Sequence, residues 1–271
     1  MCTCLFYFTA WGEPVKRRRL YQNGYSAIDI DQGSESFIGI IGTAYSRNYE
    51  NALVLGSGSG RSAGAISLSF KSLDVVDVDP NAKALMEYLI KDNYYLISHP
   101  NFKFHEIDAI IAPEVLKNKK YDLIILTVDP SFHALAAKLY TKEYFKKLKK
   151  LLTPKGVFIF WMDNTFGEHN EDLLLATAKN VFKYQRGYSI YKSPKGRNTY
   201  YLIVNSNEEI VYDIPLDIYY QVRDDRELIN RDLLSDKKSS FDFEIKTKEI
   251  NTWNKNRINN LESMRGFFEE K

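Results

Sequence analysis

The chain has 271 residues, of which 37 are basic and 35 acidic, giving a formal net charge of +2. This length suits one large α/β domain with additions at either end and is too short for two such domains. Because the charges nearly balance, no overall field would draw the chain to nucleic acid, and we expect no nucleic-acid partner.

The nearly uncharged stretch at the front, Met1 to Gly12, is about half of the roughly 20 residues needed to cross a bilayer. Basic residues follow it at 16–19 instead of preceding it, which argues against a cleaved secretion signal, so we expect a cytoplasmic location. Contact of this segment with a membrane interface stays open as an alternative to a strand or packed tail. Cys2 and Cys4 lack further ligands nearby, and no metal site is expected.

Residues 1–47 are expected to form a small β-rich segment. Alternating apolar residues on either side of Asn23-Gly24 predict a β-hairpin within Leu20–Gly42.

From about residue 48 to 205, buried strands alternate with helices, which is typical of a doubly wound, mostly parallel α/β sheet. The first strand, Ala52–Leu55, is apolar throughout, as expected for a strand covered on both faces. Further strands are predicted at Leu73–Val78, Phe102–Ile107, Tyr121–Leu126, Gly156–Trp161, Tyr184–Tyr191 and Thr199–Val204. The last two are expected to form an antiparallel edge of the sheet. Helices are predicted at Ser62–Leu68, Ala82–Leu89, Leu139–Leu151 and Glu171–Phe182. Residues 206–271 are expected to be a polar extension in which 246–271 form a helical tail or an oligomer arm.

A glycine-rich loop, Gly56-Ser57-Gly58-Ser59-Gly60, lies between the first strand and a helix. There the absent side chains let the backbone approach a ligand, and the helix offers free N–H groups. The spacing G-x-G-x-G differs from the dinucleotide pattern G-x-G-x-x-G and favours a ligand built from a nucleoside and an amino acid.

Two carboxylates follow the next two strands. Asp77 comes about 20 residues after the loop, where an acidic side chain can accept both hydroxyls of a ribose. Asp108 ends the third strand and is a candidate acceptor for the amine of adenine. Either one alone is more simply a capping or solvated residue, but their order at successive strand ends favours a nucleotide-type site.

Candidates for the chemistry follow the fourth and fifth strands. Asp129 can orient or deprotonate a nucleophile, although Asp-Pro is also ordinary turn chemistry. His133 is an alternative base. Trp161, Asp163 and Asn164 are candidates for lining an acceptor pocket, with a core role as the simpler reading of Trp161.

Over residues 20–205 the chain resembles the spermidine synthase (polyamine aminopropyltransferase) family, which has the class I S-adenosylmethionine-dependent methyltransferase fold. The motifs that carry the resemblance are Leu53–Gly60, Val76–Pro80, His99–Phe102 with Asp108, Tyr121–Ile125, Asp129-Pro130, Leu139–Tyr144 and Lys155–Phe158. The resemblance implies S-adenosylmethionine or its decarboxylated form as co-substrate and suggests a homodimer. It assigns the ribose to Asp77, the adenine to Asp108, and the amino-acid or aminopropyl portion to Gly56, Ser57, Gly58 and Gly60.

The chain departs from this family at acidic positions. Ser59 stands where the family has an aspartate in its glycine loop, and Leu126-Thr-Val-Asp129-Pro130 replaces Asp-Ser-Ser-Asp-Pro. The family's Tyr-Gln pair falls on Phe37-Ile38. Fewer carboxylates weaken the attraction for a polycation. We therefore expect a transferase that moves an aminopropyl or methyl group to an unidentified small-molecule acceptor, with a non-catalytic scaffold as the alternative.

Overall fold

The computed structural model describes residues 5–10, 13–22, 25–29, 34–128, 136–163, 166–192, 198–213 and 240–258. Its first three strands, β1 (Leu5–Ala10), β2 (Glu13–Gln22) and β3 (Tyr25–Asp29), form an antiparallel sheet in which Gln22 pairs with Tyr25. The hairpin predicted around residues 23–24 is therefore present. Cys2 and Cys4 lie outside the described residues.

The prediction that the hairpin region extends to Gly42 is wrong, because helix α1 (Ser34–Ala44) occupies residues 34–44. Ile41 follows Phe37 by four residues and Ile38 by three, and all three side chains are buried on one side of the main sheet. Gly39 and Gly42 are positions of close helix packing. A Cβ on Gly42 would lie 2.8 Å from Cδ1 of Ile125 in the sheet.

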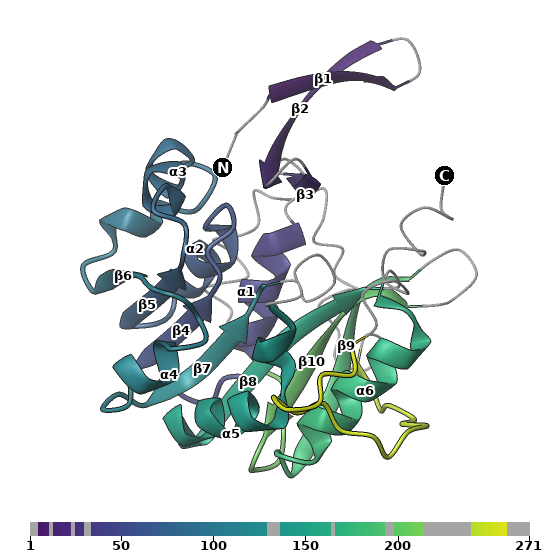
Figure 1. The fold of residues 1–271 in the computed structure, drawn as a ribbon. Helices are drawn as coiled ribbons and strands as arrows, with labels where there is room; N and C mark the ends of the chain where they lie inside the picture. Colours follow the sequence, from purple (N-terminus) through teal and green to yellow (C-terminus); the bar gives the residue numbers. More distant parts are fainter. Residues whose placement is uncertain are drawn as a thin grey trace.

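The main sheet has eight strands in the order β11-β9-β10-β8-β7-β4-β5-β6 among the described residues (Figure 1). Strands β4 to β8 are parallel, whereas β9, β10 and β11 form an antiparallel edge, as predicted for β9 and β10. The order runs outward from β4 to β6 and then resumes at β7 on the other side of β4, so a topological switch point lies between β4 and β7. The strands are β4 (Asn51–Leu55), β5 (Ser72–Asp77), β6 (Phe102–Glu106), β7 (Tyr121–Leu126), β8 (Leu152–Asp163), β9 (Tyr184–Lys192), β10 (Asn198–Ser206) and β11 (Ser240–Phe241).

Helices cover both faces of this sheet, which confirms the doubly wound α/β fold. Alternate residues of β4 enter opposite layers: Ala52 and Val54 pack with residues of α1 and α2, whereas Leu53 and Leu55 pack with residues of α5 and α6. The described residues also form helices α2 (Arg61–Ser67), α3 (Ala82–Tyr88), α4 (Ala112–Val115), α5 (Lys142–Leu151) and α6 (Glu168–Lys179), with short 3-10 helices at Leu96–Ser98 and Ala136–Tyr140. None of the helices in these ranges is long and apolar enough to cross a membrane.

Helices α1 and α2 approach each other closely at Gly39. A Cβ on this residue would lie 2.3 Å from the carbonyl oxygen of Ser62 and 2.9 Å from the Cβ of Ala65. The Ser62 hydroxyl also donates to the carbonyl of Glu35, at 2.8 Å. The first turn of α1 is thereby fixed beside the first turn of α2.

The C-terminal segment 240–258 packs against the domain, and the helix expected over residues 246–271 is not formed in this part of it. Phe241 extends the sheet by pairing with Gly187, where a Cβ would lie 2.6 Å from the Phe241 ring. Asn251 is fully buried: its backbone N–H donates to Thr177 Oγ1 at 2.9 Å, and its side-chain amide donates to the Tyr140 carbonyl at 3.0 Å. Figure 1 shows this yellow segment running beside α5 and α6.

Asp74 is a buried carboxylate inside β5, with its side chain 2% exposed. Lys119 Nζ lies 2.7 Å from both of its oxygens, His105 Nε2 lies 2.6 Å from Oδ1, and the Tyr121 hydroxyl donates to Oδ2 at 2.9 Å. Burial is the largest influence on the Asp74 pKa and raises it, but these partners together outweigh burial and hold the pKa below its ordinary value of 3.8. The cluster ties β5, β6 and β7 to one another.

The Asp74 cluster predicts acid lability. Because the folded-state pKa is depressed, the stabilisation is complete above the unfolded value of 3.8 and is lost as pH falls through the lower folded value. Asp74→Asn should lower the free energy of unfolding at pH 7 by about 1–3 kcal/mol and flatten its decline below about pH 4. Urea unfolding at several pH values tests this, with the exposed Glu87→Gln as control. An unchanged acid slope in Asp74→Asn would contradict the assignment.

The Gly39 contact predicts that added volume is destabilising. Alanine is the better helix former by roughly 0.5–1 kcal/mol, but a Cβ here meets backbone that cannot rotate away, which costs about 1–3 kcal/mol. We expect Gly39→Ala to lower the thermal midpoint in calorimetry, whereas Lys83→Ala on the exposed face of α3 leaves it nearly unchanged. A higher midpoint in Gly39→Ala would show that the two helices can separate freely.

Candidate functional site

The glycine loop follows β4 at the switch point of the sheet. Gly56, Gly58 and Gly60 have positive φ angles of 94°, 51° and 84°, a region that side chains other than glycine rarely occupy. Ser57 and Ser59 are buried, whereas Gly56 and Gly58 are half-buried. The loop therefore turns its serine side chains inward and leaves backbone on its more open side.

Asp77 holds this loop at the end of β5. Its Oδ2 accepts the backbone N–H of Ser57 at 2.8 Å and the Ser57 hydroxyl at 2.6 Å, while Oδ1 accepts the N–H of Asp79 at 2.9 Å. Gly56 N–H donates to the Val76 carbonyl at 2.9 Å and continues the β4–β5 ladder into the loop. Because a carboxylate offers about four acceptor sites, Asp77 keeps capacity for a ligand hydroxyl.

Asp108 comes shortly after β6, which lies next to β5 in the sheet. The last residue of β6, Glu106, pairs with Asp77 at the end of β5. It is exposed, and its Oδ1 accepts the N–H of Ile110 at 2.8 Å. Fully buried Tyr144 of α5 donates its hydroxyl to the Ala109 carbonyl at 2.7 Å. Burial, followed by the negative charge of Asp108, raises the pKa of the Tyr144 phenol well above its ordinary value, so this phenol stays a donor.

The end of β7 is fixed just before Asp129. The Thr127 hydroxyl donates to the Gly56 carbonyl at 2.8 Å, and Tyr140 OH donates to the Val128 carbonyl at 2.5 Å. Trp161 Nε1 donates to the Thr127 carbonyl at 3.0 Å while its ring stacks on Tyr200, with centroids 5.3 Å apart. Trp161 is thus half-buried next to this strand end, and its role in lining an acceptor pocket stays a prediction.

Several candidate catalytic residues fall outside what the structure describes. Asp129 and His133 lie in segment 129–135, and Asn164 lies in segment 164–165; the structure describes neither segment. The backbone of Asp163 is described, but its side chain is not. The described elements bring together the glycine loop, Asp77, the strand end before Asp108 and the strand end before Asp129.

Glu35 is a functional candidate that the sequence alone does not single out. From the first turn of α1 its carboxylate accepts a hydrogen bond from the hydroxyl of Ser59 in the glycine loop. Burial raises the pKa of Glu35, and the Ser59 hydrogen bond and the positive charge of Arg61 offset part of this rise. Its sequence signal is an acidic residue one position after Ser34 at a helix start, which is visible only once residues 34–44 are recognised as a helix.

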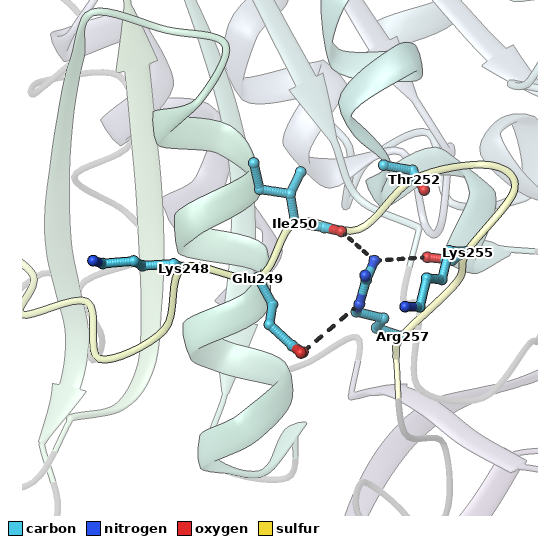
Figure 2. A pocket seen from close by; sticks show the side chains of 6 residues that line it. All are labelled: Lys248, Glu249, Ile250, Thr252, Lys255 and Arg257. Carbon is cyan, nitrogen blue, oxygen red and sulfur yellow. Dashed lines mark hydrogen bonds and ion pairs between the residues drawn. The ribbon is translucent and has the colours of Figure 1, made fainter.

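A cavity elsewhere on the molecule lies within the C-terminal segment (Figure 2). Arg257 closes its wall: Nη1 donates to the Ile250 carbonyl at 2.8 Å, and Nε lies 3.7 Å from Glu249 Oε2. The guanidinium is therefore engaged in holding its own turn, and neither the glycine loop nor Asp77 lines this cavity.

Comparison with known proteins agrees with the fold and with the resemblance in the sequence. The spermine/spermidine synthase domain model matches residues 32–213. Polyamine aminopropyltransferase 2 of Aquifex aeolicus is 25% identical over 228 residues, covering 80% of this chain and 44% of that protein. The polyamine aminopropyltransferase of Pyrobaculum calidifontis is 28% identical over 151 residues, covering 53% of this chain and 52% of the other. The chain thus spans about half the length of these curated relatives.

Among solved structures, a spermidine synthase in complex with the transition state analogue AdoDATO matches with a TM-score of 0.57 at 14% identity, covering 84% of this chain and 79% of that one. At this identity the likeness establishes the fold. The match of the family model over residues 32–213, which includes α1 as well as the glycine loop, establishes the family: this chain is a member of the spermine/spermidine synthase family.

Proposed function

We propose that this chain is an alkyl-group transferase that binds decarboxylated S-adenosylmethionine and transfers its aminopropyl group to a small-molecule acceptor. The observation that carries the proposal is the joining of the glycine loop to Asp77 at the switch point of the sheet, in a chain of this family. The relatives are named polyamine aminopropyltransferases, which favours an aminopropyl group and an amine acceptor.

The residues present suit a ligand of this kind. Positive-φ glycines leave room for a ligand against the backbone of the loop, and Asp77 retains acceptor capacity for a ribose hydroxyl. Asp108 is exposed at the adjacent strand end, which suits the proposed contact with the adenine amine.

A sulfonium co-substrate supplies a carbon that is already electrophilic, so the chain has to align the acceptor with that carbon and exclude water. The acceptor nitrogen forms a bond to this carbon, the carbon–sulfur bond breaks, and its electron pair remains on sulfur as a neutral thioether. The acceptor loses one proton, and Asp129 is our proposed group for orienting the acceptor or receiving that proton.

Methyl transfer from S-adenosylmethionine is the second candidate, because Leu126 and Ser59 stand at positions that are acidic in the family it resembles. A scaffold without catalysis is the third. A cytoplasmic location and a homodimer remain predictions from the sequence.

Binding calorimetry, together with an assay for the reaction product, should separate these functions. We expect the protein to bind decarboxylated S-adenosylmethionine and methylthioadenosine, and to form product with putrescine, spermidine or agmatine. Binding without product from these amines, together with methylation of a small molecule, would favour methyl transfer. If no nucleoside binds, the scaffold function is favoured and the transferase proposal fails.

A variant pair tests Asp77 itself. Asp77→Asn keeps an acceptor for Ser57 but loses the charge that strengthens hydrogen bonds to ribose, so methylthioadenosine affinity should fall about 10-fold to 100-fold. Asp79→Asn lies at the same strand end, is half-buried like Asp77, and serves as the matched control. Equal affinities of the two variants would remove Asp77 from the ligand site.

A further inference from the structure

We propose that Glu35 is the carboxylate that binds the primary ammonium group of the sulfonium co-substrate; this inference rests on the function proposed above. It assigns a specificity-determining role to a residue of α1, outside the sheet and its strand ends. Three features of the structure support it: the contact of Glu35 with the loop, its burial, and the packing that holds it there.

The contact places negative charge directly at the glycine loop. Oε2 of Glu35 accepts the hydroxyl of Ser59, and Ser59 is itself fully buried between Gly58 and Gly60. Within the described residues, no hydrogen bond to the second oxygen, Oε1, is found, so an acceptor remains for a ligand donor. In the proposed complex, the aminopropyl end of the ligand reaches that oxygen beside the buried Ser59 side chain.

Burial disfavours the ionised form of the Glu35 carboxylate unless a cation lies beside it. Glu35 is half-buried, and burial is the largest influence on its pKa, which is raised. The positive charge of nearby Arg61, whose Nε donates to the Ser36 hydroxyl at 3.1 Å, lowers the Glu35 pKa but does not outweigh burial. A ligand ammonium at the loop would supply the missing positive charge through a charge-assisted hydrogen bond.

The packing of α1 keeps Glu35 in this position. Gly39, one turn further along the helix, permits contact with the backbone of Ser62, and the Ser62 hydroxyl binds the carbonyl of Glu35 itself. The carboxylate is therefore held by a helix and not by a surface loop, as expected for a residue that selects a ligand.

The test compares two ligands that differ in the aminopropyl group. Decarboxylated S-adenosylmethionine carries the ammonium, whereas methylthioadenosine shares the nucleoside and lacks both the aminopropyl group and the sulfonium charge that comes with it. In calorimetry, Glu35→Gln should weaken binding of the first about tenfold or more and change binding of the second by less than about twofold. The exposed Glu50→Gln, whose carboxylate pairs with Lys71, is the matched control and should affect neither ligand.

Returning a carboxylate to the loop should restore the selectivity. The double variant Glu35→Gln with Ser59→Asp should regain most of the affinity for decarboxylated S-adenosylmethionine. If Glu35→Gln does not fold, Glu35→Asp withdraws the carboxylate by one methylene and should produce a smaller loss confined to the same ligand.

Equal losses for both ligands in Glu35→Gln would mean that Glu35 only supports the loop, and would overturn this inference while leaving the proposed function intact. Failure of the unmodified protein to bind methylthioadenosine would overturn the proposed function, and this inference with it.

Discussion

The pair of hydrogen bonds from Ser57 to Asp77 is the interaction on which the rest of the site depends. It closes a loop of left-handed glycines onto the end of a different strand, so that β4 and β5 present one continuous edge. Without it, three glycines that alternate with serines would have little to hold a single conformation, since each gains backbone freedom when the loop opens. The same carboxylate thus anchors the loop and, in the proposed function, also accepts a ligand hydroxyl.

The three-layer packing determines which side chains reach this edge. From one layer, α1 brings Glu35 to the loop because glycine at position 39 lets it lie against α2. From the other layer, α5 brings the Tyr144 hydroxyl to the backbone that follows Asp108. The C-terminal segment strengthens this second layer through Asn251. Its side-chain amide donates to the Tyr140 carbonyl, and its own carbonyl accepts the N–H of Lys142 at the start of α5. Segments distant in sequence thus support the same edge.

Three carboxylates illustrate how environment assigns different tasks to one chemical group. Asp74 is surrounded by Lys119, His105 and Tyr121, which lower its pKa and make it a structural anion. Asp77 accepts hydrogen bonds from the backbone N–H groups of Ser57 and Asp79 and from the Ser57 hydroxyl. Glu35 is half-buried, and burial raises its pKa despite the Ser59 hydrogen bond and the positive charge of Arg61.

The sequence by itself determined the fold class and most of the sheet. Apolar runs such as Tyr121–Leu126 are local signals, and the predicted bounds of that strand coincide with those of β7. It also identified the glycine loop and Asp77, which the structure joins, and Asp108, which lies at the adjacent strand end. Only the tertiary structure decided that residues 34–44 are a helix, that Asn251 anchors the C-terminal segment, and that Glu35 meets Ser59. Those features arise from contacts between residues far apart in the chain, which local periodicity cannot encode.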